Sequence, residues 1–530
     1  MLIYEGDLMR SIRWIVVLCV LVFTSVLLAA QQKEAAEAAK PGDKVAADKA
    51  GKAQESEKPA AAKEEPPVVT HHEIHVGGRI LKYTATTGYM PIRNEENGEV
   101  EANIFFMAYT LDNAPARRPL MFSFNGGPGS ASIWLHLGAI GPKRVKMLAN
   151  GEMPPPPFEL VDNEDTWLDQ TDLVFIDPVG TGYSRAVKKE LGKKFFSVKG
   201  DIASVADFIR LYLGRYQRWN SPLFLVGESY GTTRAAGLSG YLIDHGIALN
   251  GVVLVSSVLN FQTLEFTRGN DLPYILFLPT YTATAWYHKK LSSELQSRDL
   301  PSVLEEAQQF AGGAYASGLG KGDNLTAQEH QTLIDQVSKY TGIDRSVVDF
   351  NDMRLDQPTF CRELMRNSKL TVGRLDSRFL GDDLTRAGRA GQFWDPSMAA
   401  IRPPYTETFN SYVRSELGFK SDLEYYVLGG GVGEWDWGSA GEGFPDTSEA
   451  LRLAFVKNQY MKLFVANGYY DLATPFYATK YTLNHMNLTA SQHQKISLGY
   501  YDAGHMMYIK SESLQHLKKD VSAFLGSALQ

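Results

Sequence analysis

A short glycine-flanked segment carries a serine at a position where it can act as a nucleophile. The sequence GESYG (227–231) follows the apolar run 223–226 and precedes a helix-compatible stretch rich in small residues. A G-x-S-x-G sequence at a strand-to-helix turn is typical of a strained elbow, where the glycines let neighbouring backbone approach closely. We therefore predict that Ser229 is a nucleophile, with an ordinary glycine-rich turn as the alternative.

A serine hydroxyl becomes a strong nucleophile only when a base accepts its proton and an acid orients that base. Two later segments, VANGYYDLATP and LGYYDAGHMMY, place Asp471 and His505 in loops that follow apolar runs. The carboxyl ends of parallel strands meet at one edge of a sheet, and the chain order Ser…Asp…His suits such a sheet. Asp177 and Asp502 compete for the acid, but chain order and the glycine-bearing loop favour Asp471. We predict that Ser229, Asp471 and His505 form the catalytic set.

A second glycine-rich segment can stabilise the negative charge that develops when a serine attacks a carbonyl group. The sequence NGGPG follows the apolar run 119–124, and Pro128 has no N–H, so Gly126 and Gly127 remain as donors. The N–H of Tyr230 would be the second donor of an oxyanion hole. A nucleotide-binding loop is disfavoured by Pro128 and by the absence of G-x-G-x-x-G spacing.

The remaining chemistry-bearing residues predict neither a metal site nor a disulfide. His71, His72 and His75 lie on an alternating segment that points its side chains both ways, and no carboxylate completes a ligand set. The chain has two cysteines, Cys19 and Cys361, and only the second remains if the N-terminus is removed. We expect no metal and no organic cofactor.

The pattern of apolar runs predicts an α/β fold that would position these residues. The segment 71–92 alternates like a hairpin with its turn at Gly77-Gly78, and further short apolar runs are separated by helix-compatible stretches. Runs without alternation indicate a mostly parallel sheet that is buried on both faces. These runs cover 104–109, 119–124, 173–176, 223–226, 252–255, 463–466 and 496–501. Amphipathic helices over 300–310, 327–340 and 345–366 predict a helical cap inserted at about 261–426.

The N-terminus indicates export. Residues 14–30 form an apolar run that follows Arg10 and Arg13 and ends in small residues. This pattern is typical of a secretory signal, which we expect over 1–30. An uncleaved membrane anchor is the alternative. Residues 31–69 lack aromatic residues, Leu, Ile and Met, so we expect a disordered Ala/Lys/Glu/Pro linker. The folded body would then span 70–530. We expect a periplasmic or secreted protein, with membrane contact only through 14–30.

The charge balance excludes one large class of partner. The 530-residue chain has 53 Lys and Arg against 60 Asp and Glu, a formal net charge of −7. Because nucleic-acid binding requires a basic surface, we expect no nucleic-acid partner. At 44% hydrophobic and 21% charged residues, the chain is instead typical of a globular protein with a large core.

Four segments together resemble one family. FNGGPGSAS (124–132), IDPVGTGYS (176–184), GESYG (227–231) and DAGHM (502–506) are similar in sequence and order to the serine carboxypeptidases, peptidase family S10. The resemblance implies an α/β-hydrolase fold with a helical cap and removal of C-terminal residues from peptides. The near absence of cysteine suggests a bacterial-type, disulfide-free member.

The resemblance also implies roles for individual residues. Ser229 would be the nucleophile, His505 the base and Asp471 its partner, with Gly127 and Tyr230 as oxyanion donors. The three further site residues would bind substrate: Asn125 and Glu228 would hold its C-terminal carboxylate, and Met506 would line the pocket at the scissile bond. A carboxyl can hydrogen-bond a carboxylate only when one of the two is protonated, so Glu228 would favour peptide cleavage at low pH.

Several positions depart from the family pattern. Ala139 stands where the family usually has Glu, Ser123 where it has Trp, and Thr474 where the loop after the aspartate has Cys. Loss of the second Glu weakens the predicted grip on a C-terminal carboxylate. The sequence therefore predicts an exported serine carboxypeptidase that acts on peptides through an acyl-enzyme on Ser229. An esterase, amidase or acyltransferase with the same residues is the alternative, and a non-catalytic binding protein is disfavoured.

Overall fold

A computed structural model of the protein describes residues 64–115, 117–383, 394–438 and 443–530. The signal or anchor expected over 1–30, and the linker up to residue 63, lie outside the described residues. The folded body comprises residues 65–530. Within the described ranges, no helix combines the length and apolar character that a membrane crossing requires.

The core of the body is a large mixed sheet. In the described residues the sheet has ten strands in the order β1-β2-β3-β7-β4-β9-β10-β13-β14, with β8 paired to β3. These strands are β1 Val68–Val76, β2 Arg79–Arg93, β3 Val100–Leu111, β4 Leu120–Phe124, β7 Asp172–Ile176, β8 Arg185–Ala186, β9 Leu223–Ser229, β10 Gly251–Ser257, β13 Lys462–Gly468 and β14 Ile496–Tyr501. Every apolar run expected to be a strand lies in one of them, except that the run 119–124 starts one residue before β4. The predicted hairpin turn at Gly77-Gly78 joins β1 to β2.

The strands that carry the predicted site residues are parallel. The pairs β7·β4, β4·β9, β9·β10, β10·β13 and β13·β14 are all parallel, whereas β1, β2 and β3 form an antiparallel extension at one edge. The carboxyl ends of β4, β9, β13 and β14 therefore lie along the same edge. The residues predicted to do chemistry lie at the end of β9, at the start of α5 and in the segments that follow β4, β13 and β14.

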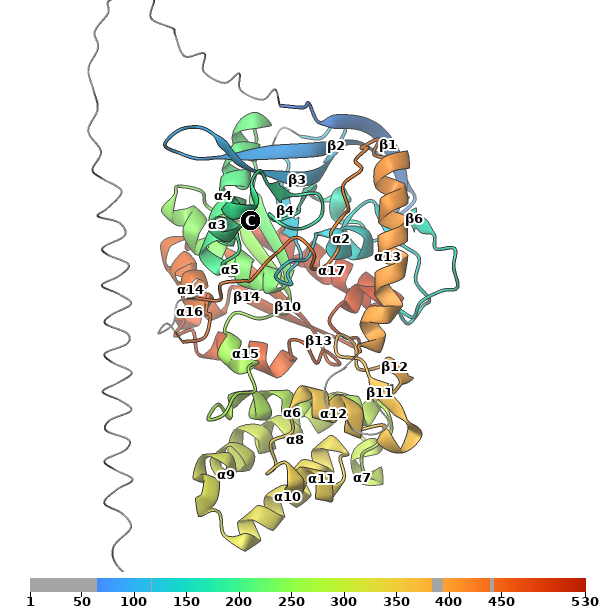
Figure 1. Ribbon diagram of the computed structural model, residues 1–530, viewed down its shortest axis with the longest axis vertical. Coiled ribbons are helices and arrows are strands. Elements are labelled where there is room, and N and C mark those ends of the chain that lie inside the picture. Colours follow the sequence, from blue (N-terminus) through green and yellow to red (C-terminus); the bar gives the residue numbers. More distant parts are fainter. Residues whose placement is uncertain (1–63, 116, 384–393, 439–442) are drawn as a thin grey trace, which may run out of the picture. The chain divides into compact units, whose positions relative to one another are not determined.

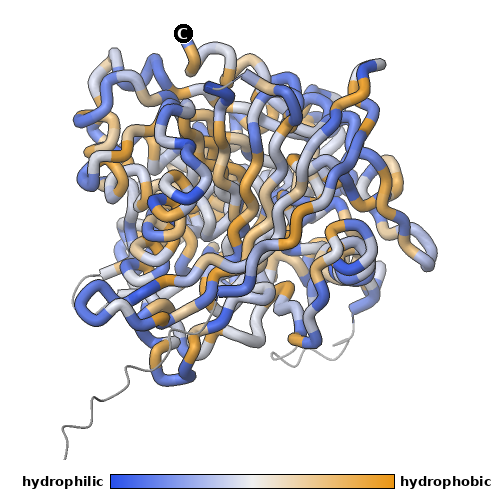
Figure 2. Tube along the Cα trace, turned by 90° about the horizontal axis from the view of Figure 1, so that it is seen from above, coloured by the Kyte–Doolittle hydropathy of each residue, from blue (hydrophilic) through white to orange (hydrophobic). Residues whose placement is uncertain are grey.

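Helices cover both faces of the sheet, and alternate strand residues supply two separate cores. One core combines Phe105, Met107 and Tyr109 with apolar residues of α13 and α17, and the other combines Ile104, Phe106 and Ala108 with α4, α5 and α14. The helices are α4 Val198–Arg215, α5 Tyr230–Asp244, α13 Pro396–Ser415, α14 Ser448–Lys457 and α17 Ser511–Ala528. Figure 1 shows this layering, and Figure 2 shows hydrophobic strands in the middle of the body with hydrophilic residues toward its periphery.

The chain between β10 and β13 contains a helical cap with a core of its own (Figure 1). Its helices are α6 Leu272–Tyr287, α7 Ser293–Gln296, α8 Leu300–Phe310, α9 Ala316–Lys321, α10 Ala327–Thr341, α11 Arg345–Phe350 and α12 Gln357–Glu363. A hairpin follows, made of β11 Leu370–Val372 and β12 Leu380–Asp382, and we call its residues 373–379 the hairpin loop. The next helix, α13, packs in the sheet core rather than in the cap core, although it falls within the expected insertion of 261–426.

Two boundaries differ from the sequence expectation. The folded body begins before Thr70, because Val68 and Val69 already pair with Thr87 and Thr86 of β2. The single helix expected over 345–366 is two helices, α11 and α12. Asp352 and Met353 have positive φ between them, and α12 restarts at a new cap where Asp356 accepts the N–H of Thr359. An amphipathic pattern that continues across a short turn hides such a break.

Candidate active site

The segment around Ser229 is the strand-to-helix turn that the sequence predicts. β9 ends at Ser229 and α5 begins at Tyr230, and Ser229 has φ 60° and ψ −132°. A non-glycine residue rarely occupies this region, so the turn is strained. Glu228 and Tyr230 are 3% and 1% exposed, whereas Ser229 between them is only partly buried. The turn therefore presents the serine to solvent at the carboxyl edge of the sheet.

The glycine-rich loop after β4 lies directly against this turn. A Cβ added to Gly126 would stand 2.4 Å from the backbone nitrogen of Tyr230, a separation that no side chain can occupy. Gly127 has φ 103°, in the region that favours glycine. The backbone of Gly127 and that of Tyr230, the two predicted oxyanion donors, thus belong to segments in direct contact. The packing brings together the two predicted donor segments.

His505 and Asp471 are joined by a hydrogen bond. The distance from His505 Nδ1 to Asp471 Oδ2 is 2.7 Å, and the two residues are 4% and 0% exposed. The competing aspartates lie elsewhere: Asp502 forms an ion pair with Lys510, and Asp177 accepts the N–H of Ser132 at 2.8 Å. Of the three candidate acids, Asp471 is the one whose carboxylate contacts His505.

The Asp471 carboxylate is held by its own loop as well as by the histidine. Oδ1 accepts the N–H groups of Ala473 and Thr474 at 2.7 and 2.9 Å, and Oδ2 accepts the Thr474 hydroxyl at 2.8 Å. Thr474 Oγ1 also lies 3.2 Å from His505 Nδ1. Donors surround the carboxylate, so its orientation is fixed.

Contact with Asp471 changes the proton affinity of His505. Burial lowers the pKa of His505, but the charge and hydrogen bond of Asp471, aided by Glu228, outweigh it and raise the pKa above its usual value. A neutral imidazole that a carboxylate orients and makes more basic is suited to accept a proton from a serine. The cause of the shift is thus a specific partner rather than general burial.

The sheet register connects the histidine to the serine. Ser257 of β10 pairs with Ser229 of β9, and the hydroxyl of its neighbour Ser256 donates to the carbonyl of His505 at 2.6 Å. Within the described residues, the Ser229 hydroxyl forms no hydrogen bond with His505. Such bonds are commonly long in enzymes without substrate and tighten when substrate binds.

Glu228 and Asn125 form a buried pair behind the serine. Asn125 Nδ2 donates to Glu228 Oε1 at 2.9 Å, and the Tyr508 hydroxyl donates to Glu228 Oε2. Burial raises the pKa of Glu228 to about 7, although His505 and the hydrogen bonds from Tyr508 and Asn125 act against this rise. Met506, the remaining predicted site residue, is 4% exposed and directly follows His505. A carboxyl that exchanges its proton near neutral pH therefore lies beside the serine.

Tyr508 and Thr474 are site residues that the motifs did not identify. A Cβ on Gly138 would stand 2.4 Å from the Tyr508 ring and 2.6 Å from the Tyr405 hydroxyl. Two tyrosines therefore occupy the space beside Gly138, the residue before Ala139. The only sequence signal for Tyr508 is its place three residues after His505. Thr474 was noted only as a departure from the family pattern.

The segment after α13 packs onto the glycine-rich loop. Gly429 N–H donates to Gly129 O at 2.9 Å, and the rings of Trp435 and Trp437 meet Tyr230 with centroids 5.4 and 6.1 Å apart. The aromatic residues of this segment are thus packed against the helix that follows Ser229. They form part of the wall near the candidate site.

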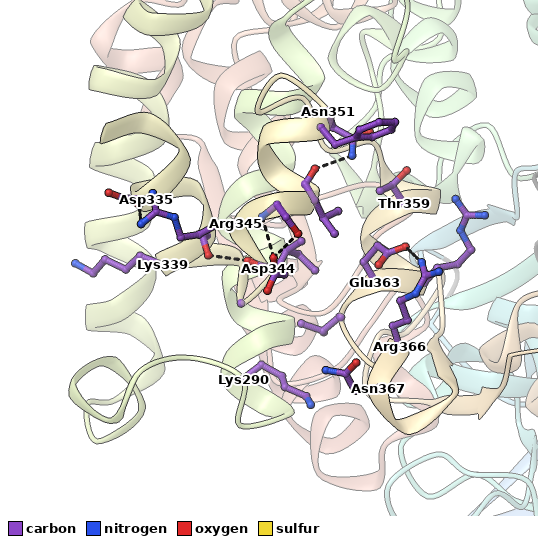
Figure 3. Close-up of a pocket in the computed structure, with 18 of the residues that line it drawn as sticks. Lys290, Asp335, Lys339, Asp344, Arg345, Asn351, Thr359, Glu363, Arg366 and Asn367 are labelled. Atoms are coloured by element: carbon purple, nitrogen blue, oxygen red, sulfur yellow. Dashed lines mark hydrogen bonds and ion pairs between the residues drawn. The ribbon is translucent and has the colours of Figure 1, made fainter. Parts of the chain in front are cut away.

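A hollow of about 1250 Å³ in the cap is separate from this site (Figure 3). Two ion pairs lie in its lining, Arg345 with Asp335 at 2.5 Å and Arg366 with Glu363. None of the predicted site residues lines it. Among the described residues, no group of three or more His, Cys, Asp or Glu side chains is arranged to hold a metal ion, and Cys361 is a buried free thiol.

The fold and the site together define an α/β-hydrolase that presents a serine, a histidine and an aspartate on the loops of a mostly parallel sheet. The sequence model described as "Serine carboxypeptidase" (Peptidase_S10) matches residues 77–518, and the chain belongs to this family. A solved structure of the prohormone-processing carboxypeptidase KEX1(delta)p from Saccharomyces cerevisiae shares the fold. The TM-score is 0.50 at 17% identity, covering 83% of this chain and 91% of that one.

Relatives in other organisms match parts of the chain. "Serine carboxypeptidase S10 family member 1" of Dictyostelium discoideum is 24% identical over 260 residues, which is 48% of this chain and 55% of that protein. "Serine carboxypeptidase-like 7" of Arabidopsis thaliana is 31% identical over 153 residues, 28% of this chain and 33% of that protein. The matched region thus spans between about a third and about half of these two relatives.

Proposed function

We propose that this protein is a serine carboxypeptidase that releases C-terminal residues from peptides. Family membership supports the reaction class. The observation that carries the proposal is the 2.7 Å hydrogen bond between His505 and Asp471 at the sheet edge where Ser229 is only partly buried. A serine, a base and an orienting acid are what acyl transfer through a covalent intermediate requires.

In the proposed mechanism, Ser229 Oγ attacks the carbonyl carbon of the last peptide bond while His505 Nε2 accepts its proton. The N–H groups of Gly127 and Tyr230 stabilise the oxyanion, and Asp471 stabilises the imidazolium. His505 then protonates the departing amine, which leaves as the free C-terminal residue. Water, deprotonated by His505, hydrolyses the acyl-enzyme and restores Ser229.

Recognition of the C-terminus is assigned to Asn125 and Glu228, with Met506 lining the pocket beside the scissile bond. The buried Glu228 carboxyl has a pKa of about 7, so it is largely protonated below that pH and can donate a hydrogen bond to a substrate carboxylate. Above that pH, two carboxylates would repel each other. The proposal therefore includes a preference for free-carboxylate substrates at acidic pH.

Loss of a second glutamate supports one alternative function. With Ala139 where the family usually has Glu, Glu228, which accepts a hydrogen bond from Tyr508, would be the ionisable partner for a substrate carboxylate. An esterase, amidase or acyltransferase would use Ser229, Asp471 and His505 in the same way without needing to bind a substrate carboxylate.

Export by the segment 14–30, to the periplasm or the exterior, is part of the proposal and rests on sequence alone.

The test compares an N-blocked dipeptide with its C-terminal amide and its methyl ester, between about pH 4 and about pH 8. A carboxypeptidase cleaves the free-carboxylate peptide preferentially at the acidic end, and Ser229→Ala abolishes this activity. Equal turnover of the amide or ester with no carboxylate preference would replace the proposal with the esterase or amidase alternative. No turnover of any of the three would exclude both.

A further inference from the structure

The hairpin loop of the cap lies between the two loops that carry Asp471 and His505. On one side it brackets the aspartate, because Leu472 N–H donates to Arg374 O at 3.1 Å and Ser377 N–H donates to Tyr470 O at 3.0 Å. The two residues flanking Asp471 are thus both hydrogen-bonded to this loop. In Figure 1 the β11–β12 hairpin lies where the cap helices meet the body.

On its other side the hairpin loop holds the histidine. His505 N–H donates to Leu375 O at 2.6 Å, and Gly504 N–H donates to Asp376 Oδ2 at 2.9 Å. A Cβ added to Gly504 would stand 2.5 Å from the Cα of Asp376. The two segments therefore touch through their backbones, and displacement of one displaces the other.

The Asp376 side chain is itself fixed. Arg378 donates to it through Nε at 2.9 Å and through Nη2 at 2.6 Å, and the Arg378 backbone N–H donates at 3.1 Å. Asp376 and Arg378 are 2% and 8% exposed. Both carboxylate oxygens accept only from N–H groups, and the guanidinium compensates the buried charge.

We propose that Asp376 is a positioning residue for His505: it fixes the backbone at Gly504 so that the imidazole meets Asp471 and faces Ser229. This inference rests on the proposed function. Asp376 does not touch the imidazole, so it acts through the peptide N–H of Gly504. Displacement of a catalytic group by about 1 Å can cost about a hundredfold in rate. Because Asp376 would position a catalytic group and not a substrate-binding group, its loss should lower kcat more than it raises KM.

The test uses Asp376→Asn, which keeps the volume but replaces one acceptor oxygen with an NH₂ group. Arg378 donates to both oxygens and Gly504 to Oδ2, so in either orientation the NH₂ group faces an Arg378 donor, and in place of Oδ2 it also faces Gly504 N–H. The matched control is Asp172→Asn, at the start of β7 and thus at the opposite edge of the sheet. Asp172 likewise pairs with Arg118 at 2.8 Å and accepts a backbone N–H, that of Leu111, at 3.0 Å.

The first readout is the rate at which a fluorophosphonate labels Ser229. In this reaction the Oγ–P bond forms, the P–F bond breaks and His505 accepts the proton, so the rate requires the histidine but no peptide recognition. We expect labelling and kcat to fall by about tenfold or more in Asp376→Asn, with KM changed by less than about threefold. Asp172→Asn should retain both rates even though it lowers the unfolding temperature.

The second readout is the acid limb of kcat/KM for the ester substrate. The charged groups acting on His505 are Asp471 and Glu228, which raise its pKa, and Arg374, which lowers it. A displaced imidazole loses part of its contact with Asp471, so its pKa falls and the acid limb moves to lower pH. A defect confined to stability would leave this limb unchanged.

An unchanged labelling rate and acid limb in Asp376→Asn would overturn the proposal, as would an equal loss of rate in Asp172→Asn. Asp376→Glu provides a second variant if the first fails to fold, because it keeps the charge that Arg378 requires while displacing the acceptor of Gly504. Its labelling rate should also fall. If the wild type labels at Ser229 but cleaves no peptide, the carboxypeptidase assignment fails while the positioning role is still decided by labelling.

Discussion

The hydroxyl of Tyr508 donates a hydrogen bond to Oε2 of Glu228, a residue 280 positions earlier in the chain. Oε1 of the same carboxyl accepts from Asn125. Burial and the charge of Glu228 raise the pKa of Tyr508 well above its usual value, so this phenol stays protonated. Glu228 is therefore the member of this cluster that titrates near neutral pH.

Glu228→Gln should remove the pH dependence of carboxylate recognition. In the wild type, the ratio of kcat/KM for a free-carboxylate peptide to that for its amide should fall as the pH rises through about 7, where Glu228 loses its proton. Glutamine donates a hydrogen bond at every pH, so the ratio should become flat. Because both substrates depend equally on His505, the ratio isolates Glu228. A flat ratio in the wild type would contradict this assignment.

Tyr508→Phe should move the midpoint of that ratio to higher pH. The hydrogen bond from Tyr508 favours ionised Glu228, so its loss raises the pKa of the carboxyl further. A hydrogen bond to a charged group contributes about 1.5–3 kcal/mol, which corresponds to an upward shift of about one pH unit or more.

The control is Tyr405→Phe, since the Tyr405 hydroxyl lies beside Gly138 but donates no hydrogen bond to Glu228 in the described residues. Its midpoint should stay near that of the wild type. A downward shift in Tyr508→Phe, or equal shifts in both variants, would show that the bond does not set the titration of Glu228.

Thr474→Val should lower kcat while leaving KM nearly unchanged. The hydroxyl donates to Asp471 Oδ2 and lies 3.2 Å from His505 Nδ1, so its loss frees the carboxylate to rotate away from the imidazole. One lost hydrogen bond of about 1–1.5 kcal/mol predicts a decrease of about five- to thirteenfold. Thr474→Ser keeps the hydroxyl and should recover most of the wild-type kcat. The rate is measured with the ester assay and with fluorophosphonate labelling. Wild-type rates in the valine variant would refute the prediction.

Asp201→Asn should destabilise the turn that carries Ser229. Asp201 forms a buried ion pair with Arg234 at 2.8 Å and accepts the Tyr230 hydroxyl at 3.0 Å, and Arg234 Nη1 donates to Asn125 O at 2.7 Å. Removing one charge of a buried pair leaves the other uncompensated, which costs about 3–5 kcal/mol of unfolding free energy.

Thermal unfolding of Asp201→Asn should be compared with that of Glu449→Gln, which breaks the exposed pair with Arg452. The exposed pair should change the unfolding free energy by less than about 1 kcal/mol. Similar unfolding temperatures for the two variants would mean that the buried pair does not stabilise the turn.

The sequence predicts the strands and the main site residues because both depend on local pattern and chain order. Ser229, Asp471 and His505 each follow an apolar run, and parallel strands bring such loops to one edge. Tyr508 and Asp376 were missed because their roles depend on contacts with residues distant in the chain. The expected cap insertion of 261–426 also took in α13, because hydrophobic patterning does not tell which core an element joins.

The hydrogen bonds of the hairpin loop determine where the cap can be exchanged. Helices α6 to α12 share their own core, whereas the hairpin loop is bonded to the segments on both sides of Asp471 and to His505. A chimaera that imports a foreign cap should therefore have its downstream crossover before Leu370, so that the recipient keeps its own hairpin. The unit to exchange is then the helical bundle, and an imported bundle must pack against Val372 of β11, which lies in the cap core.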